Sequence, residues 1–368
     1  MSQTRKTAIV VGSAFGVRVH GRALRASGFE VVGLVGRDPE KTAHRARRAD
    51  IPHAFTSMTE ALGLGPLVVA IASPPATHFA IASEAFDAGA HVMCEKPFTL
   101  TQAEALELSR KAAGAGLVGY LGHEFRFTES AALVARLLAE GAIGAPRLAT
   151  FVAHGGLVAD PAFAMPDWWF NLELGGGWLG ASGSHAVDRA RAWLGEISGV
   201  SASLFNVAPR PAGSAEDSFD LRFTTDGGAQ GVMQSTAADR APPITTTKII
   251  GERGTIWIED RLGRGSVEGV DGAVMLADAQ GVREIPVPDD LRLDQTGIDP
   301  EYARNVAPFA ELYRRMAAAI EGAAPAPGAT APATFEDGVR NMAVLDAART
   351  SAAAGSAWIS IDLAANAG

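Results

Sequence analysis

The lysine within Glu95-Lys96-Pro97 is the residue of this chain best placed to do chemistry. It follows a short apolar run, Ala90–Cys94, which is predicted to form a buried strand. Ligands of open parallel sheets bind beyond the carboxyl ends of the strands. A charged amine at that point adds little to packing but can transfer a proton or orient a substrate. Lys96 is therefore a candidate catalytic residue, whereas Glu95 is more typical of a structural carboxylate than of a base.

A second candidate is His185, which follows the three successive glycines Gly175–Gly177. Glycines permit a close approach of the backbone that an apolar core does not reward. Ala186–Trp193 is predicted to be helical, so the imidazole lies near a helix start. Imidazoles titrate near neutral pH and often act as general acids or bases. A lone histidine in an apolar segment is more often structural, so both interpretations stay open.

A glycine-containing turn, Val11–Gly16, follows the predicted strand Thr7–Val11 and opens the predicted helix Val17–Ser27. In a dinucleotide-binding turn of this kind, backbone amides at the helix start face the pyrophosphate. Alanine stands where such turns have their second glycine, and many other turns contain two glycines for steric reasons. The residues predicted to contact a cofactor here are Gly12, Ala14, Phe15 and Gly16.

Positive charge gathers after the second predicted strand, Glu30–Val35, in Arg37, Lys41 and Arg45. NAD-binding proteins usually have an acid at the end of this strand for the ribose hydroxyls, and an arginine nearby accommodates the additional phosphate of NADP. Gly36 occupies the acid's position. NADP(H) is therefore the predicted cofactor, with NAD(H) as the second choice. The alternative is a solvated basic face of the predicted helix Pro39–Asp50.

The elements that carry these residues follow two patterns. Strands and helices alternate in the first third of the chain, which is typical of a doubly wound parallel Rossmann sheet. From about residue 147, strand-like segments follow one another without helices, which indicates an α+β domain with an open, largely antiparallel sheet. We therefore predict an α/β fold with a dinucleotide-binding domain over 1–123 and a substrate and oligomerisation domain over 124–368. A C-terminal helix over 335–354 is expected to pack back on the body.

Composition excludes several classes of function. The chain has 368 residues, 47% of them hydrophobic and 20% charged, as in soluble globular proteins. Its net charge of -9 argues against a nucleic-acid or anionic-membrane partner. Cys94 is the only cysteine, and the histidines lack the spacing of metal ligands, so no metal site is expected. With no apolar leader and no membrane-spanning run, the expected location is the cytoplasm.

At this point the chain resembles the Gfo/Idh/MocA family of oxidoreductases, which includes glucose–fructose oxidoreductase and inositol dehydrogenase. The resemblance rests on Gly12–His20, Cys94–Pro97, Arg126-Phe127 and Gly175–Asp188, in the family's order and spacing. It implies an N-terminal Rossmann domain, a C-terminal α/β domain, and NAD(P)-dependent oxidation or reduction of sugars, polyols and related cyclic compounds. Family members commonly use the open sheet face to form dimers or tetramers, so a homodimer or homotetramer is expected.

The resemblance also implies residue roles. Lys96 would contact the nicotinamide ribose and the substrate hydroxyl, and His185 would exchange the proton. Asp188 matches a structural aspartate of the family. The chain departs from the family at Ala181, where an aspartate of the substrate and proton network is usual. The remaining residues expected at the cofactor are Ser73, Pro74, His78, Glu95 and Lys96. His78 is included because it lies just past the end of the third predicted strand, and capping of the next helix is the plainer role for it.

Candidate substrate contacts are Arg126, Trp168, Trp169, Trp178 and His185. Arg126 either binds substrate or pairs with an acid. The tryptophans either line a pocket, which would favour a bulkier or more aromatic substrate than a simple polyol, or fill the core. The favoured function is hydride transfer between nicotinamide and a secondary alcohol or ketone. Two alternatives are a glycosidase-like enzyme that retains its dinucleotide and a cofactor-binding sensor that has lost catalysis.

Overall fold

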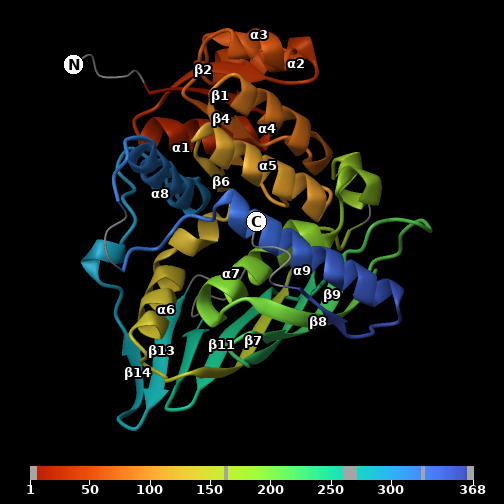
Figure 1. Ribbon diagram of the computed structural model, residues 1–368, viewed down its shortest axis with the longest axis vertical. Helices are drawn as coiled ribbons and strands as arrows, with labels where there is room; N and C mark the ends of the chain where they lie inside the picture. The colour runs from red at the N-terminus through yellow and green to blue at the C-terminus, as the bar shows by residue number, and fades with distance from the viewer. Residues whose placement is uncertain (1–5, 161–164, 260–271, 325–327, 363–368) are drawn as a thin grey trace. The chain divides into compact units, whose positions relative to one another are not determined.

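The computed structural model describes residues 6–160, 165–259, 272–324 and 328–362 (Figure 1). The chain divides into two compact units. The first comprises residues 1–127 and 293–339, and the second comprises 128–292 and 340–368. The predicted boundary after residue 123 assigned 293–339 to the second domain. In the structure this segment belongs to the first unit, because its side chains complete that unit's core.

The described part of the first unit contains a parallel sheet of six strands in the order β3-β2-β1-β4-β5-β6. The strands are β1 Thr7–Val11, β2 Glu30–Val35, β3 His53–Phe55, β4 Val68–Ile71, β5 His91–Cys94 and β6 Gly119–Leu121. Every residue of β4 is buried, as is usual for strands covered on both faces. Outward from β1 the chain order reverses between β2 and β4, which is the topological switch point of a doubly wound fold.

Helices connect the strands of this sheet. They are α1 Gly21–Ala26, α2 Pro39–Arg48, α3 Met58–Leu62, α4 His78–Asp87 and α5 Gln102–Ala115, with short turns η1 Gly16–His20, η2 Pro75–Thr77 and η3 Glu124–Phe127. The predicted helix Val17–Ser27 is thus a π-helical turn followed by α1. Thr101 caps α5, since its side chain accepts the Glu104 amide at 3.3 Å.

Helix α8 (Ala303–Ile320) completes the first unit although it lies far along the chain. Figure 1 shows it beside α1. Phe309, Leu312 and Tyr313 are fully buried and belong to the same apolar cluster as Leu24 and Leu34. The start of α9 (Phe335–Ala353) also joins this unit, where Phe335 packs against Phe98 with ring centroids 4.3 Å apart.

The second unit, as far as it is described, contains a mixed sheet of nine strands in the order β14-β13-β12-β11-β7-β10-β9-β8-β15. Only β7 and β10 pair in parallel among these strands; the other neighbours are antiparallel. The strands are β7 Pro146–His154, β8 Ile197–Phe205, β9 Ser218–Thr225, β10 Gln230–Thr236, β11 Ile244–Gly251, β12 Thr255–Glu259, β13 Ala273–Asp278, β14 Gly281–Ile285 and β15 Ile359–Ser360. The predicted fold class, α/β with a parallel Rossmann sheet and a largely antiparallel second sheet, is confirmed.

Two helices of the second unit matter for the site. Helix α6 (Glu129–Ala139) packs near β13, and α7 (Ser184–Leu194) carries His185 in its first turn. Every residue of α7 except Ala192 is buried. The short turns of this unit are η4 Asp167–Phe170, η5 Leu172–Leu174, η6 Leu179–Gly183 and η7 Asp289–Leu291. The predicted C-terminal helix is present as α9, whose later turns belong to this unit.

Candidate cofactor and catalytic site

The glycine turn after β1 has the backbone geometry of a close approach. Gly12 has φ +107°, and a Cβ atom there would lie 2.3 Å from the carbonyl oxygen of Ala72. No residue with a side chain fits at position 12, because the turn after β1 contacts the backbone just after β4 at this point. Gly16 then opens η1, the π-helical turn that leads into α1. Phe15 lies edge-on to His20, with ring centroids 5.4 Å apart.

The basic helix α2 is joined to this turn. The Arg45 guanidinium donates to the Ser13 hydroxyl at 2.7 Å, so Arg45 lies beside the predicted phosphate-binding loop. Arg37 and Lys41 are exposed. The acid nearest to the end of β2, Asp38, accepts the amide of Lys41 at 2.9 Å and caps α2. Its carboxylate therefore serves the helix, and among the exposed side chains from Arg37 to Arg48 the basic ones outnumber the acid Glu40.

Lys96 directly follows Glu95 at the carboxyl end of β5, as predicted, and the Lys96–Pro97 peptide is cis. Glu95 is only 8% exposed, and its Oε2 accepts the Lys96 amide at 3.2 Å. Burial alone would raise the pKa of the Glu95 carboxyl. The hydrogen bond and charge of His20, together with Lys96, outweigh burial and leave that pKa lowered. The end of β5 thus holds a buried carboxylate next to the candidate catalytic lysine.

His20 and Tyr313 were not predicted as site residues, but both are fully buried next to Glu95. His20 Nε2 lies 3.0 Å from Glu95 Oε1, and His20 Nδ1 lies 3.0 Å from the Tyr313 hydroxyl. Tyr313 is 293 residues from His20 in the chain, so no local spacing could have indicated the contact.

His78 is fully buried, and both of its ring nitrogens face backbone carbonyls. Nε2 lies 2.9 Å from the Ser73 oxygen, and Nδ1 lies 3.1 and 3.0 Å from those of Pro97 and Phe98. Burial lowers the pKa of His78. The ring therefore joins the loop after β4, which contains Ser73 and Pro74, to the segment after Lys96. The sequence led us to expect that His78 contacts the cofactor. Both ring nitrogens are already used in these backbone contacts, so neither is left to bind a cofactor.

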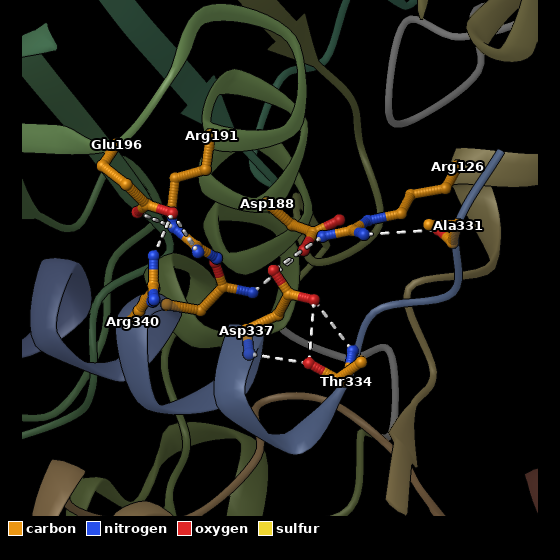
Figure 2. Close-up of polar contacts among 9 residues, drawn as sticks. Arg126, Asp188, Arg191, Glu196, Ala331, Thr334, Asp337 and Arg340 are labelled. Carbon is orange, nitrogen blue, oxygen red and sulfur yellow. Dashed lines mark hydrogen bonds and ion pairs between the residues drawn. The ribbon is translucent and has the colours of Figure 1, made fainter. Parts of the chain in front are cut away.

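Arg126 has an acidic neighbour in the first unit. Its Nη2 lies 3.5 Å from Asp337 Oδ1, and its Nη1 donates to the Ala331 carbonyl at 3.3 Å (Figure 2). Asp337 also accepts the Thr334 amide at 2.9 Å, in a reciprocal cap at the start of α9. Of the two roles predicted for Arg126, pairing with an acid is the one the contacts display. A substrate contact stays a prediction.

His185 is 3% exposed in the first turn of α7, and Asp188, one turn later, accepts the Asn341 amide at 3.1 Å. Arg191 donates to Glu196 at 2.7 Å and to Asn341 at 2.7 Å, and Arg340 donates to Glu196 at 3.0 Å (Figure 2). These contacts attach α7 to the later turns of α9. The contact with Asn341 supports the structural role predicted for Asp188, because it ties α7, the helix that carries His185, to α9.

Three tryptophans of the second unit lie next to one another with tilted rings. Trp168 and Trp169 have ring centroids 5.6 Å apart, and Trp169 and Trp178 have centroids 5.9 Å apart. Trp178 is 4% exposed, and its indole nitrogen donates to Ser235 at 2.8 Å. Trp178 therefore fills the core and supports the other two rings, which are partly exposed. Of these three, Trp168 and Trp169 are partly exposed, and their role as pocket walls stays a prediction.

The backbone at the three glycines approaches other atoms closely, as predicted. The atoms it approaches belong to Trp168 and Glu216 of the same chain. A Cβ atom on Gly176 would lie 2.3 Å from the Trp168 carbonyl oxygen. Gly177 has φ +109°, and a Cβ atom there would lie 2.4 Å from Glu216 Oε1. Burial raises the pKa of the Glu216 carboxyl, which accepts the Leu179 amide at 3.0 Å. The glycines thus let the tryptophan segment and Glu216 pack against the chain that leads to His185.

Two kinds of feature are missing from the described ranges. No group of three or more His, Cys, Asp or Glu side chains there has the arrangement of a metal site. None of the helices within those ranges combines the length and the apolar character needed to cross a bilayer.

A glycine turn, a six-stranded parallel sheet and a switch point beside β1 define a dinucleotide-binding Rossmann protein. Comparison with known families agrees. Residues 6–123 match the model of an oxidoreductase family with an NAD-binding Rossmann fold, and residues 132–257 match the GFO/IDH/MocA C-terminal domain. The chain belongs to the GFO/IDH/MocA family of oxidoreductases.

Individual relatives agree with this membership. An uncharacterized oxidoreductase of Synechocystis is 34% identical over 209 residues, 56% of each chain. Levoglucosan dehydrogenase of Pseudarthrobacter phenanthrenivorans is 32% identical over 178 residues, 47% of this chain and 44% of that protein. The chain thus matches about half the length of these relatives. A solved levoglucosan dehydrogenase with NADH and levoglucosan shares the fold, with a TM-score of 0.83 at 23% identity over 96% of this chain and 99% of the other.

Proposed function

We propose that the protein is an NAD(P)-dependent dehydrogenase or reductase that moves hydride between nicotinamide and a secondary alcohol or ketone carbon. The observation that carries this proposal is Lys96, which follows a buried Rossmann strand and is backed by the buried carboxylate of Glu95. Relatives that act on sugars, such as levoglucosan dehydrogenase, favour a sugar, polyol or related cyclic compound as substrate.

In this proposal Lys96 binds the nicotinamide ribose and the substrate hydroxyl, and His185 exchanges the hydroxyl proton. The dinucleotide, when bound, supplies or accepts the hydride. Its pyrophosphate would lie at the turn of Gly12–Gly16, where the start of η1 offers backbone amides. Ala181 occupies the family's usual aspartate position, so Lys96 and His185 are the remaining pair for proton transfer.

A panel of sugars, polyols, anhydro sugars and cyclic ketones, assayed with NADP⁺, NADPH, NAD⁺ and NADH at the nicotinamide absorbance band, tests the activity. With the substrate so found, Lys96→Ala and His185→Ala should each lower kcat by about 10²–10⁴-fold. Glu107→Ala, on the exposed face of α5, is the control and should leave kcat unchanged. Full turnover in both site variants contradicts the assignment.

We further propose that NADP(H) is preferred over NAD(H). The support is the positive charge of Arg37, Lys41 and Arg45 next to the glycine turn, and the use of the nearest acid, Asp38, as a helix cap. A fluorescence titration that gives NADH a dissociation constant equal to or below that of NADPH contradicts this preference.

The open face of the nine-stranded sheet is proposed as the surface of a homodimer or homotetramer. Leu148, Val232 and Ile250 are 46%, 42% and 37% exposed, and Ile250 pairs directly with Leu148 across β7 and β11. Exposed apolar side chains grouped in this way are typical of association surfaces. Light scattering on the purified protein should give a mass of two or four chains, and a monomer at micromolar concentration contradicts the proposal.

The glycosidase-like and sensor functions make different predictions. A dinucleotide-retaining glycosidase would purify with its cofactor and release sugar without net change in nicotinamide absorbance. A sensor, suggested by Ala14 and Ala181, would bind NADPH without turnover of any compound on the panel.

A further inference from the structure

A chain of hydrogen bonds runs through the first unit to the backbone of Lys96. The Tyr313 hydroxyl contacts His20 Nδ1 at 3.0 Å, and His20 Nε2 contacts Glu95 Oε1 at 3.0 Å. The other oxygen, Glu95 Oε2, accepts the Lys96 amide at 3.2 Å. Tyr313 and His20 are fully buried and Glu95 nearly so, which means that water cannot replace a lost partner.

The proton positions in this chain follow from the chemistry of its ends. Burial and the charge of Glu95 raise the pKa of the Tyr313 phenol well above its ordinary value, so the hydroxyl keeps its proton. The phenol hydroxyl, which can donate or accept, contacts Nδ1, and the Nε2–H of His20 donates to the Glu95 carboxylate. Each buried group then has a partner of the right kind.

The lysine segment is also held on its far side. His78, from the start of α4, contacts the carbonyl oxygens of Pro97 and Phe98. The charged or titratable groups that face Glu95 are therefore His20 from η1, His78 from α4, Tyr313 from α8, and Cys94 and Lys96 from its own segment.

We propose that Tyr313 and His20 are positioning residues for Lys96, which act by holding the Glu95 carboxylate that accepts the Lys96 amide. The role of Lys96 in this inference rests on the proposed function. Helix α8 lies far along the chain from β5, outside the alternating strands and helices of the Rossmann sheet. It would nevertheless contribute to the geometry of the candidate catalytic residue.

The contact between Glu95 and Lys96 can be measured without a substrate. The chain contains five lysines, so ¹⁵N-lysine labelling gives at most five backbone amide signals, and Lys96→Arg assigns the one of interest. As pH falls through the pKa of Glu95, the Lys96 amide signal should shift, and Glu95→Gln should abolish this titration. If the Lys96 amide signal titrates in Glu95→Gln as it does in the wild type, the inference is overturned.

Tyr313→Phe removes only the hydroxyl at the far end of the chain. We expect the titration midpoint of the Lys96 amide to move to higher pH, because His20, the donor that keeps Glu95 ionised, loses the contact that holds its ring in place. Tyr302→Phe is the matched control: its ring lies under Arg22 and takes no part in the chain, so the midpoint should stay at the wild-type value. Equal midpoints in Tyr313→Phe and wild type overturn the inference.

If Tyr313→Phe does not fold, His20→Asn serves as the second variant. Its amide can keep a contact with Tyr313 but is too short to reach Glu95, so the same upward shift is expected. An unchanged midpoint in that variant counts against the inference.

A kinetic measurement separates this inference from the proposed function. Displacement of a catalytic group by about 1 Å costs up to roughly 10²-fold in rate, so Tyr313→Phe should lower kcat toward that limit while the NADPH dissociation constant stays within about twofold. If Lys96→Ala is inactive and Tyr313→Phe has wild-type kcat, only the positioning role fails. If Lys96→Ala is fully active, the proposed function fails instead.

Discussion

Arg37 and Arg45 determine, at the scale of single residues, which dinucleotide the protein should prefer. A guanidinium can bind the 2′-phosphate of NADP with charge-assisted hydrogen bonds, which NAD cannot accept. Arg45 is already held beside the glycine turn by Ser13.

Arg37→Ala and Arg45→Ala should each weaken NADPH binding by about tenfold, or about 1.4 kcal/mol, and change NADH binding little. Arg47→Ala, an exposed arginine two residues further along α2, is the control and should bind both cofactors as the wild type does. Fluorescence titration with each cofactor measures the effect. Equal losses of NADPH and NADH affinity would show that the arginines do not recognise the additional phosphate.

Glu95 should make stability depend on pH. Its folded pKa is lowered below the ordinary value of 4.5, so the carboxylate stabilises the fold above that value and loses its contribution as pH falls through the folded pKa. Glu95→Gln should therefore be less stable than wild type at neutral pH, by about 1–3 kcal/mol, and the difference should shrink in acid. Urea unfolding at several pH values measures this. Glu107→Gln on the surface of α5 should show a small difference that does not vary.

Some residue roles could be predicted and others could not. Lys96 and His185 belong to short local patterns, and the structural role of Asp188 stays a prediction that its hydrogen bond with Asn341 supports. Trp178 was predicted with the substrate contacts, but it lies in the core because Ser235, from a strand 57 residues away, accepts its indole hydrogen. His78 was predicted at the cofactor, yet carbonyls of two separate loops occupy its nitrogens.

At the scale of elements, the turn before His185 depends on a glycine that no other residue can replace. Gly177→Ala adds a Cβ atom 2.4 Å from the Glu216 carboxylate at φ +109°. Gly213→Ala is the matched control, since Gly213 also has a positive φ of +82° but has open space around it.

Gly213→Ala should cost about 1–2 kcal/mol, which is the backbone strain alone. Gly177→Ala should lower the free energy of unfolding by clearly more than this, because the buried Glu216 carboxylate must also move and lose its hydrogen bond with the Leu179 amide. Urea unfolding of the two variants measures the difference. Equal losses of stability would mean that Glu216 moves aside freely.

Elements with a simple local pattern were predicted almost to the residue. β1 and β2 have the predicted bounds, because continuous apolar character is a property of neighbouring residues. Helix α8 was not predicted, although its buried residues recur at helical spacing, at Val306, Phe309, Ala310, Tyr313 and Ala317. That periodicity was a usable signal for the helix, but not for the unit it joins.

For the whole molecule, the first unit should depend on a helix that is distant in the chain. Phe309 of α8 is fully buried and lies 4.4 Å from the His20 ring between centroids. Phe309→Ala should destabilise the protein by about 3–5 kcal/mol, as expected for a large cavity in a core. Phe205→Ala, at a side chain that is 40% exposed, should cost less than about 1 kcal/mol. Urea unfolding measures both, and similar losses would contradict the placement of α8 in this core.

The sequence by itself determined the class of fold, the family and the local patterns around Gly12, Lys96 and His185. Each of these depends on residues that are close together in the chain, where periodicity, turn chemistry and short motifs are informative. Only the tertiary structure decided that α8 completes the Rossmann unit, that Tyr313 reaches His20, and that Trp178 and His78 are interior residues. Those outcomes depend on packing between segments far apart in the chain, and the local pattern of a segment indicates which of its faces is buried but not which distant segment covers that face.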